Sequence, residues 1–235
     1  NTLRPIQIED LLGRDPIIHK SESIGKKIKD SVILITGGGG SIGSELCRQI
    51  MIYKPKQLII LENNELALYS IEAELKELYS NTEKIIAILG NATNENLIFK
   101  ILKENNINII FHAAAYKHVP IVEANPIEGL LNNVISSFVI CKASKFYKVK
   151  DVVLISSDKA VRPTNIMGAS KRLSELIFKS FSIESQDTLY SMVRFGNVLG
   201  SSGSVVPRFQ KQIENGGPIK VTHPEIIRYF MTINE

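Results

Sequence analysis

The segment from Ser156 to Lys171 carries side chains that are suited to moving protons. Asp158 and Lys159 are adjacent, which places a carboxyl group and an amine side by side. Two such groups can serve as general acid and general base once their surroundings bring their pKa values toward neutrality. Met167 and Lys171 stand four residues apart in a helix-like stretch and therefore share one helix face. Because a thioether has no proton to exchange, Lys171 is the ionisable member of that pair.

A structural interpretation of the same residues has to be weighed against the chemical one. An Asp-Lys dipeptide is most often part of an exposed turn, and a helical methionine is most often a core residue. A position directly after a buried parallel strand favours chemistry instead, because α/β proteins bind ligands at the carboxyl ends of such strands. The elements around Asp158 and Lys159 therefore decide between the two interpretations.

Short runs of β-branched residues alternate with longer segments of helical period, the pattern of a parallel sheet with crossover helices. The expected strands are 32–36, 57–61, 84–89, 107–111, 151–156 and 188–195. The expected helices are 41–52, 66–78, 95–104, 126–147 and 166–181. We therefore predict an α/β fold with a doubly wound, Rossmann-type parallel sheet.

The predicted elements divide the chain into three regions. Residues 1–30 are expected to be a polar linker with one short amphipathic piece, and residues 31–195 a dinucleotide-binding domain that carries the chemistry. Residues 196–235 are expected to form part of a substrate-binding region. The chain starts at Asn1 and stops directly after a strand-like run, so we expect it to be a piece of a longer protein.

Composition excludes several classes of function. The net charge of +4 is dispersed, without the basic runs or interleaved aromatic residues of a nucleic-acid groove. Cys47 and Cys141 belong to no Cys-x-x-Cys motif, so neither a structural zinc nor a disulfide framework is expected. No apolar run approaches the roughly 20 residues that a membrane span needs. We expect a soluble, cytoplasmic chain with reduced cysteines, no metal and no membrane contact of its own.

A glycine-rich loop joins the first expected strand to the first expected helix. Gly37 permits a tight turn, Gly40 lets the backbone approach a pyrophosphate, and Gly43 lets the helix pack on the strand. The helix N-terminus would then face the phosphates. The expected cofactor contacts in this loop are Thr36, Gly37, Gly40, Ser41, Ile42 and Gly43.

An acidic residue at the end of the second strand suggests which dinucleotide binds. Glu62 lies where a carboxylate commonly accepts hydrogen bonds from the adenosine ribose, and its charge would repel a ribose phosphate. This favours NAD, with NADP as the alternative because Arg48 on the first helix weakens the preference. The structural interpretation of Glu62 is a solvated strand end.

Small and polar residues follow the third and fourth strands. Asn91 and Ala92 are expected beside the adenine, where the Asn91 amide oxygen can accept a hydrogen bond. The segment of Ala113, Ala114 and Ala115 is expected to lie against the ribose on the nicotinamide side, although small residues there are also ordinary packing. Asn132 and Asn133 lie in an apolar helix, where a buried amide must be hydrogen-bonded; we expect Asn133 to brace the active-site strand.

Four motifs carry a family resemblance: Thr36-Gly-x-x-Gly-x-x-Gly43, His112-Ala-Ala-Ala-Tyr-Lys-His-Val-Pro120, Ser157-Asp-Lys-Ala160 and Met167-x-x-x-Lys171. Together they resemble the CapD-like polysaccharide biosynthesis proteins, extended short-chain dehydrogenases that act as UDP-N-acetylglucosamine 4,6-dehydratases. The resemblance covers essentially the whole chain, and the last two motifs are the more specific. It implies that carbon 4 of the sugar is oxidised by NAD, water is lost across carbons 5 and 6, and the hydride returns to carbon 6.

The resemblance also implies roles for the proton-transfer residues. Lys159 is the base that removes the proton from carbon 5, and Asp158 is the acid that protonates the departing hydroxyl. Met167 occupies the position of the usual tyrosine, and Lys171 holds the nicotinamide ribose. The group that takes the proton of the carbon 4 hydroxyl stays open. Asp158 is favoured; the alternatives are Ser157 through a water molecule, and Tyr116.

The implied substrate contacts lie mostly in the last third of the chain. Arg228 is the best candidate for a diphosphate clamp, because a guanidinium binds phosphate oxygens in a bidentate manner. The segment from Ser204 to Phe209 resembles the uridine-binding segment of the family, and Arg194-Phe-Gly-Asn197 follows the sixth strand. The expected substrate residues are Lys117, His118, Asn197, Ser204, Val205, Arg208 and Arg228.

The chain departs from the family pattern at several positions, and two other functions stay open. Ser157 replaces a threonine, Ser136 a glycine, and Asn91 and Asn94 replace aspartates. A nucleotide-sugar epimerase or reductase would need the tyrosine that Met167 replaces, and a noncatalytic NAD-binding regulator would have no reason to keep Asp158 beside Lys159. The resemblance further implies a homo-oligomer and a membrane anchor upstream of this region in long family members.

Overall fold

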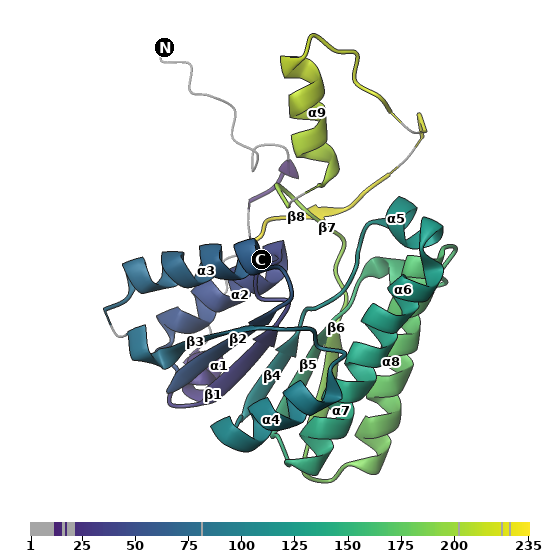
Figure 1. The fold of residues 1–235 in the computed structure, drawn as a ribbon. Coiled ribbons are helices and arrows are strands. Elements are labelled where there is room, and N and C mark those ends of the chain that lie inside the picture. Colours follow the sequence, from purple (N-terminus) through teal and green to yellow (C-terminus); the bar gives the residue numbers. More distant parts are fainter. Residues whose placement is uncertain are drawn as a thin grey trace. The chain divides into compact units, whose positions relative to one another are not determined.

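The computed structural model describes residues 12–15, 17, 22–80, 82–201, 203–221, 223–225 and 227–235 (Figure 1). The chain forms two compact units. The larger unit comprises Glu22–Phe195, and the smaller comprises Gly196–Glu235 together with the residues before Glu22. The helix α1 (Glu22–Ile28), which falls within residues 1–30, belongs to the larger unit, and Ile28 is buried in its core.

The larger unit is built on one parallel sheet with the strand order β3-β2-β1-β4-β5-β6. This is the doubly wound Rossmann topology, and it confirms the predicted fold class. The strands are β1 (Val32–Thr36), β2 (Gln57–Glu62), β3 (Ile85–Leu89), β4 (Ile109–His112), β5 (Asp151–Ile155) and β6 (Leu189–Val193). The chain reverses its direction of winding between β1 and β4, and this switch point opens the crevice in which such sheets bind ligands.

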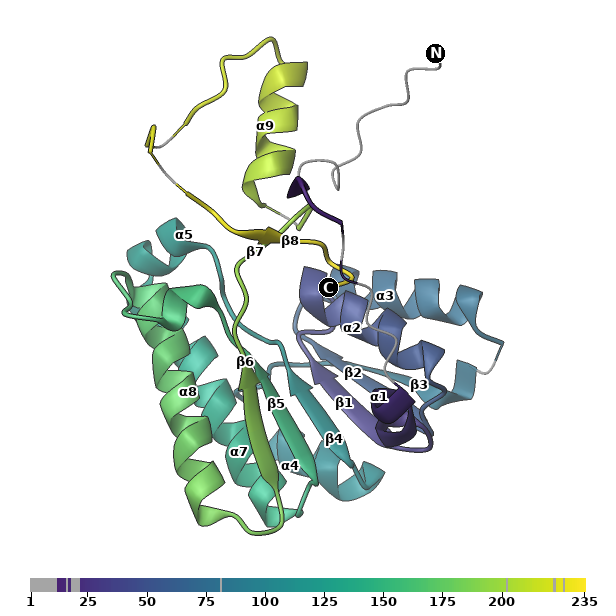
Figure 2. The ribbon, with the colours of Figure 1, turned by 180° about the vertical axis from the view of Figure 1, so that it is seen from behind.

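Helices cover both faces of the sheet, as the two opposite views show (Figures 1 and 2). One face packs against α1 (Glu22–Ile28), α2 (Ser41–Ile52) and α3 (Glu65–Leu78). The other packs against α4 (Glu95–Asn105), α7 (Ser136–Phe146) and α8 (Ile166–Glu184). All five residues of β1 are buried because the strand lies between two helical layers, which explains its uninterrupted apolar run.

The expected long helix 126–147 is interrupted. It consists of α6 (Pro126–Leu130), a π-helical turn (Leu131–Ile135) and α7, and a further short helix, α5 (Val119–Ala124), precedes it. Single π turns inside helices are frequent at functional sites. Here the turn contains Asn133, whose side chain bonds to backbone outside the helix, so the regular helical period is locally lost.

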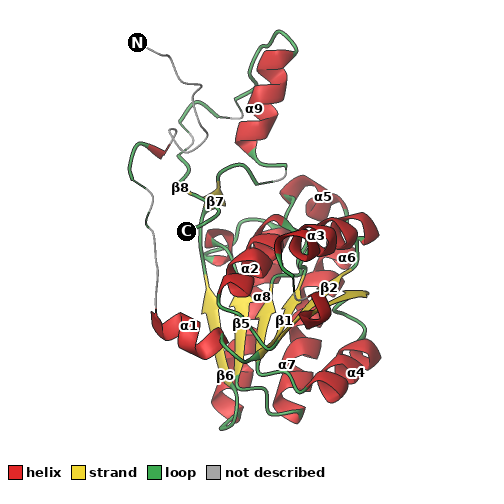
Figure 3. Cartoon of the chain, turned by 90° about the vertical axis from the view of Figure 1, so that its left-hand side faces the viewer, coloured by secondary structure: helices red, strands yellow, loops and turns green. Residues whose placement is uncertain are grey.

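The smaller unit contains α9 (Val205–Glu214) and two short parallel strands, β7 (Asn197–Val198) and β8 (Phe230–Met231) (Figure 3). Arg14 joins the start of the described chain to its end. Its Nη1 and Nη2 atoms lie 2.6 Å and 3.0 Å from the two carboxylate oxygens of Glu235. Among the helices in the described part of the chain, none is both long and apolar enough to span a membrane.

Candidate active site

The loop from β1 to α2 leaves little room for side chains at most of its glycines, and at Gly37 and Gly43 a Cβ atom would meet backbone atoms. Gly37 has φ +70°, and a Cβ atom there would lie 2.6 Å from the backbone nitrogen of Ala114. A Cβ atom on Gly43 would overlap the carbonyl oxygen of Gly37. Gly40 differs, because a Cβ atom there would meet only the Gly37 oxygen at 3.3 Å. The surroundings of Gly40 are thus open enough for a ligand.

The N-terminus of α2 is suited to an anion. Gly40 is its N-cap residue without a side-chain cap, and the first turn, which starts at Ser41 and Ile42, holds no acidic residue. The first amides of a helix carry partial positive charge and attract phosphate groups. The loop therefore fits a dinucleotide pyrophosphate.

Glu62 holds the glycine loop in place. Its Oε2 atom accepts a hydrogen bond from the Gly39 amide at 2.9 Å, and Oε1 accepts bonds from the amides of Asn63 and Asn64 at 2.9 Å and 3.0 Å. Glu62 is 8% exposed, so it is not a solvated strand end. A carboxylate offers about four acceptor positions, which leaves capacity for a ribose hydroxyl.

Arg48 does not have a free charge to offer to a ribose phosphate. Its Nε atom lies 2.5 Å from Oε1 of Glu74, its Nη2 atom lies 2.8 Å from Oε2, and its Nη1 atom lies 3.2 Å from Glu45. The hydrogen bond from Arg48 lowers the pKa of Glu74, so both members of the pair stay charged. Arg48 lines a cavity of about 400 Å³ between α2 and α3. The expectation that Arg48 weakens the preference for NAD therefore loses its basis.

The hydrogen bonds of Asn91 differ from those expected for an adenine contact. Its Oδ1 atom already accepts hydrogen bonds from the backbone nitrogen and the Oγ1 atom of Thr93, at 2.9 Å and 3.0 Å. The amide oxygen, which we expected to face the adenine, is thus engaged in a turn. The amide NH2 group is the part that suits a ligand, and it donates rather than accepts. Ala92, the next residue, is buried.

A buried polar chain links the glycine loop to the π-helical turn. Thr36 Oγ1 lies 2.7 Å from Nδ1 of His112, and Nε2 of His112 lies 3.2 Å from Oγ of Ser137. Ser137 donates in turn to the carbonyl oxygen of Asn133 at 2.8 Å. Burial lowers the pKa of His112 to about 3, so the ring is neutral. Because Ser137 uses its one proton on the Asn133 carbonyl, Nε2 of His112 is the donor to Ser137, and Nδ1 accepts the proton of Thr36 Oγ1.

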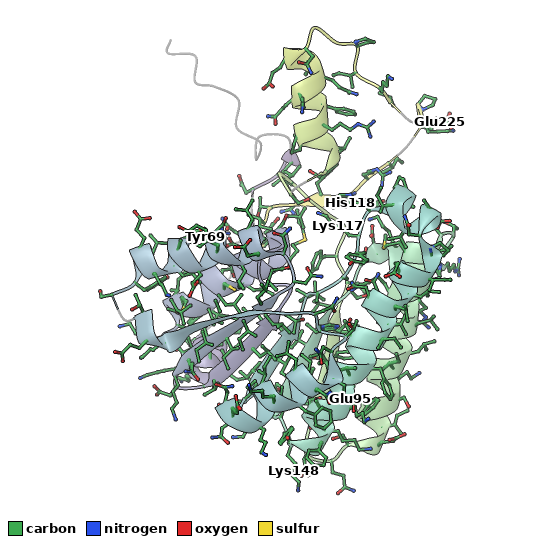
Figure 4. All side chains as sticks on the ribbon, in the orientation of Figure 1. Tyr69, Glu95, Lys117, His118, Lys148 and Glu225 are labelled. Atoms are coloured by element: carbon green, nitrogen blue, oxygen red, sulfur yellow. The ribbon has the colours of Figure 1, made fainter. Side chains whose placement is uncertain are left out.

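Asn133 fixes the segment that follows β4. Its Oδ1 atom accepts from the Tyr116 amide at 2.7 Å, and its Nδ2 atom donates to the Tyr116 carbonyl at 3.0 Å and to Ser170 Oγ at 2.9 Å. Asn133, rather than Asn132, makes the bracing contacts, but they go to the segment after β4 and to α8 and not to a strand. The small side chains of 113–115 precede this clamp. Lys117 and His118 follow it on the exposed loop that leads to α5 (Figure 4).

Asp158 and Lys159 form an ion pair directly after β5. Lys159 Nζ and Ser157 Oγ each lie 2.9 Å from Oδ1 of Asp158. A backbone bond also fixes the turn, because the Asp158 amide donates to the Phe195 carbonyl at 3.1 Å. Burial alone would raise the pKa of Asp158, but the bonds from Lys159 and Ser157 outweigh it and hold the pKa below its usual value. The raised pKa that an acid requires is therefore absent at rest, and the resting carboxylate is ionised.

Lys171 and Met167 lie on the face of α8 that adjoins the Asp158–Lys159 turn. Lys171 Nζ donates to the Ile155 carbonyl at 2.6 Å, which leaves further donors for a ribose. Burial lowers the pKa of Lys171 to about 8, while Glu175 opposes the shift. Met167 is 3% exposed, consistent with a packed side chain. Gly168 brings α8 close to the ion-pair turn, because a Cβ atom there would overlap the Lys159 carbonyl oxygen.

Arg194 pairs with a buried carboxylate that we did not predict as its partner. We placed Arg194 with the substrate-contact segment, but its Nε and Nη2 atoms lie 2.7 Å and 2.5 Å from the carboxylate oxygens of Glu175. Ser156 Oγ donates to the same carboxylate at 2.6 Å. The available indication that Glu175 belongs to the site was its spacing of four residues from Lys171, which places both on the same face of α8. Arg194 thus belongs to the support of the site.

The remaining predicted substrate residues lie in the smaller unit. Ser204 is the N-cap of α9, and its Oγ atom is buried without a hydrogen-bond partner among the described residues. Asn197 in β7 donates its amide to the Tyr229 carbonyl at 3.0 Å, which brings Asn197 beside the segment that contains Arg228. Val205 and Arg208 lie in the first two turns of α9.

Comparisons with known proteins assign the chain to a family. Residues 33–235 match the family model described as "Polysaccharide biosynthesis protein". The chain is 44% identical over its whole length to the capsular polysaccharide biosynthesis protein CapD of Staphylococcus aureus, of which it covers 39%. It is 45% identical over 99% of its length to the probable polysaccharide biosynthesis protein EpsC of Bacillus subtilis, of which it also covers 39%.

A solved structure has a similar fold. Pen from Bacillus thuringiensis superimposes with a TM-score of 0.82 at 37% identity, over 88% of this chain and 65% of that one. The chain spans about two fifths of the length of the two curated relatives, so the match describes one region of a longer architecture. From its motifs, its sheet and these matches, the chain belongs to the polysaccharide biosynthesis protein family, as a CapD-like extended short-chain dehydrogenase.

Proposed function

We propose that the chain is the catalytic region of an NAD-dependent nucleotide-sugar 4,6-dehydratase that acts on UDP-N-acetylglucosamine. One observation carries the proposal. The Asp158–Lys159 ion pair follows β5, beside the buried amine of Lys171, at the same sheet edge as the glycine loop after β1. Such a site holds two proton-transfer groups next to a dinucleotide-binding loop. It lacks the tyrosine of an ordinary dehydrogenase, because Met167 occupies that position.

The residues present fit NAD. Gly37 and Gly43 set the loop, Gly40 leaves room for a pyrophosphate, and Glu62 can accept a ribose hydroxyl. The negative charge of Glu62 disfavours a ribose phosphate, and the carboxylates of Glu74 and Glu45 compensate Arg48, which supports NAD over NADP. When bound, NAD supplies the hydride acceptor for carbon 4 and the hydride donor for carbon 6.

The chain's own groups account for the proton transfers. Asp158, which its lowered pKa keeps ionised at rest, accepts the proton of the carbon 4 hydroxyl once the bond from Lys159 has opened. It then returns this proton to the departing carbon 6 hydroxyl, so one carboxyl group serves as base and afterwards as acid. Lys159 removes the carbon 5 proton, which the carbon 4 ketone makes acidic, and later returns a proton to carbon 5. The resting bond from Lys159 Nζ to Asp158 must open first, because an amine acts as base only when it is neutral.

The smaller unit supplies the proposed nucleotide contacts. Arg228 is proposed to bind the diphosphate, because a guanidinium matches phosphate oxygens with paired donors. The backbone around Ser204 and Val205 is proposed to bind the uracil, with Asn197 and Arg208 nearby in the same unit. The buried hydroxyl of Ser204, which has no hydrogen-bond partner among the described residues, supports this, because a buried polar atom usually has one. Lys117 and His118 are proposed sugar contacts from the loop before α5.

Product analysis tests the proposal. The full-length gene product, incubated with UDP-N-acetylglucosamine, is expected to form a UDP-sugar lighter by one water, with a carbon 4 ketone and a carbon 6 methyl group in proton spectra. Heat-released NAD measured on the same sample shows that the cofactor is present. A UDP-sugar of unchanged mass would identify an epimerase. No conversion by NAD-loaded protein would favour a noncatalytic regulator.

A further inference from the structure

A buried carboxylate behind the ion-pair turn has no part in the proton transfers described above. Glu175 lies one helical turn after Lys171, and its side chain is 1% exposed. Its oxygens accept four hydrogen bonds: one from Ser156, two from Arg194, and one from Arg172 Nη1 at 3.1 Å. Burial would raise the pKa of Glu175, but the bonds from Arg194, Ser156 and Arg172 hold it at about 2.

Three of these bonds, one from Ser156 and two from Arg194, tie two strand ends to one helix. Ser156 directly follows β5 and Arg194 directly follows β6, so the Glu175 carboxylate joins both ends to α8. The Ser156 amide also donates to the Val193 carbonyl at 2.8 Å. The carboxylate therefore fixes the spacing of the two strands where the sheet ends and the reactive turn begins.

The Asp158–Lys159 turn is connected to both Ser156 and Arg194. Asp158 lies two residues after Ser156, and its amide donates to the carbonyl of Phe195, the neighbour of Arg194. One residue before Ser156, the Ile155 carbonyl accepts the bond from Lys171 Nζ. A shift of the Glu175 carboxylate would thus move the Asp158–Lys159 turn relative to Lys171.

Stability alone is a weak reason for such a cluster. Taking charges out of water costs about as much as their attraction returns, so a buried ion pair contributes little net stability compared with apolar residues of the same volume. What a fully bonded carboxylate does provide is fixed geometry, because each bond restricts one partner. Misplacing a catalytic group by about 1 Å can cost roughly 100-fold in rate.

We propose that Glu175 is a positioning residue for the dehydration, and that it sets the Asp158–Lys159 turn against Lys171 through Ser156 and Arg194. The inference rests on the proposed function for its kinetic test, but its geometric test does not. Glu175 acts through other residues and touches no reacting atom.

The test replaces Glu175 by glutamine, which keeps the shape but removes the charge and directs an NH2 group at a guanidinium. The full-length Glu175→Gln protein is expected to lose kcat roughly 10- to 100-fold, with the KM for UDP-N-acetylglucosamine and the bound NAD within about twofold of the parent. The matched control is Glu184→Gln on the same helix, whose exposed carboxylate pairs with Lys145 at 2.8 Å; it should behave like the parent.

A second readout needs no turnover. Lys171 faces Glu175 on its own helix and the neutral His112 on β4, and the Glu175 charge raises the pKa of Lys171. Removing that charge should lower the pKa of Lys171 below that of the parent, measured by the NMR titration of its Cε carbon, and Glu184→Gln should leave it unchanged. A crystal structure of Glu175→Gln should show the Asp158–Lys159 turn displaced.

The outcomes separate the two claims. Glu175→Gln could show a displaced turn and a lowered Lys171 pKa while the parent protein shows no dehydration. That combination would support the positioning role and overturn the proposed function. An unmoved turn with a parental kcat would overturn the positioning role alone. If Glu175→Gln does not fold, Ser156→Ala removes only the 2.6 Å bond and leaves the ion pairs; a loss of kcat at unchanged KM supports the role, and a parental kcat overturns it.

Discussion

Replacing Lys159 by methionine is expected to reduce kcat for dehydration by about 10²- to 10⁴-fold, the range for loss of a general base. Methionine fills a similar volume but cannot remove the proton from carbon 5. The NAD content should not change, because the glycine loop and Glu62 are held by contacts that do not involve Lys159. Steady-state product formation and heat-released NAD measure the two effects separately.

A matched control for this substitution is Lys148→Met. Lys148 lies in an exposed ion pair with Asp187, far from the labelled Lys117 and His118 at the other end of the sheet (Figure 4). Exposed ion pairs contribute between about 0 and 1 kcal/mol, so both activity and stability should stay close to the parent. If Lys159→Met kept more than about a tenth of the parental kcat, Lys159 would not be the base.

Alanine at Gly37 and at Gly40 is expected to give two different defects in the same loop. Gly37→Ala forces an L-residue to φ +70° and drives its Cβ against the Ala114 backbone, so the free protein should be destabilised. A loss of about 2–3 kcal/mol corresponds to a fall in Tm of very roughly 5–10 °C for a unit of this size. Gly40→Ala meets only the Gly37 oxygen at 3.3 Å and should leave the Tm of the free protein nearly unchanged.

The defect of Gly40→Ala should appear on adding NAD. The new Cβ atom occupies space that the pyrophosphate would use at the N-terminus of α2, so NAD affinity should fall by about tenfold or more. Thermal melts with and without NAD, together with calorimetric titration, distinguish the two variants. Normal NAD affinity in Gly40→Ala would show that the loop does not hold the pyrophosphate, and a parental Tm in Gly37→Ala would contradict the loop geometry.

The parts of the fold that follow from local sequence were predictable. The continuous apolar run of β1 and the glycines after it belong to contiguous residues, and their physical requirements can be recognised one after another. The break at the π-helical turn was not predictable, because Asn133 leaves the helical pattern to bond with Tyr116, 17 residues away. A pattern of local hydrophobicity contains no information about such a partner.

The electrostatics of the site were the least predictable part. The expectation for Arg48 failed because Glu74 lies 26 residues away in sequence but within hydrogen-bonding distance in space. The role of Arg194 was missed because Glu175 lies 19 residues before it. The pKa expected for Asp158 was wrong in sign, because its neighbours donate hydrogen bonds to the ionised form. Side-chain pairing across elements decides charge states, and only the fold specifies it.

The transfer of hydride from carbon 4 to carbon 6 is the central claim, and isotopic labelling tests it most directly. The full-length gene product is incubated with UDP-N-acetylglucosamine that carries deuterium at carbon 4, and the position of the label is determined by NMR. We predict a 4-keto product with the deuterium in its carbon 6 methyl group. Deuterium that remains on carbon 4, in an epimer or in unchanged substrate, would contradict the account.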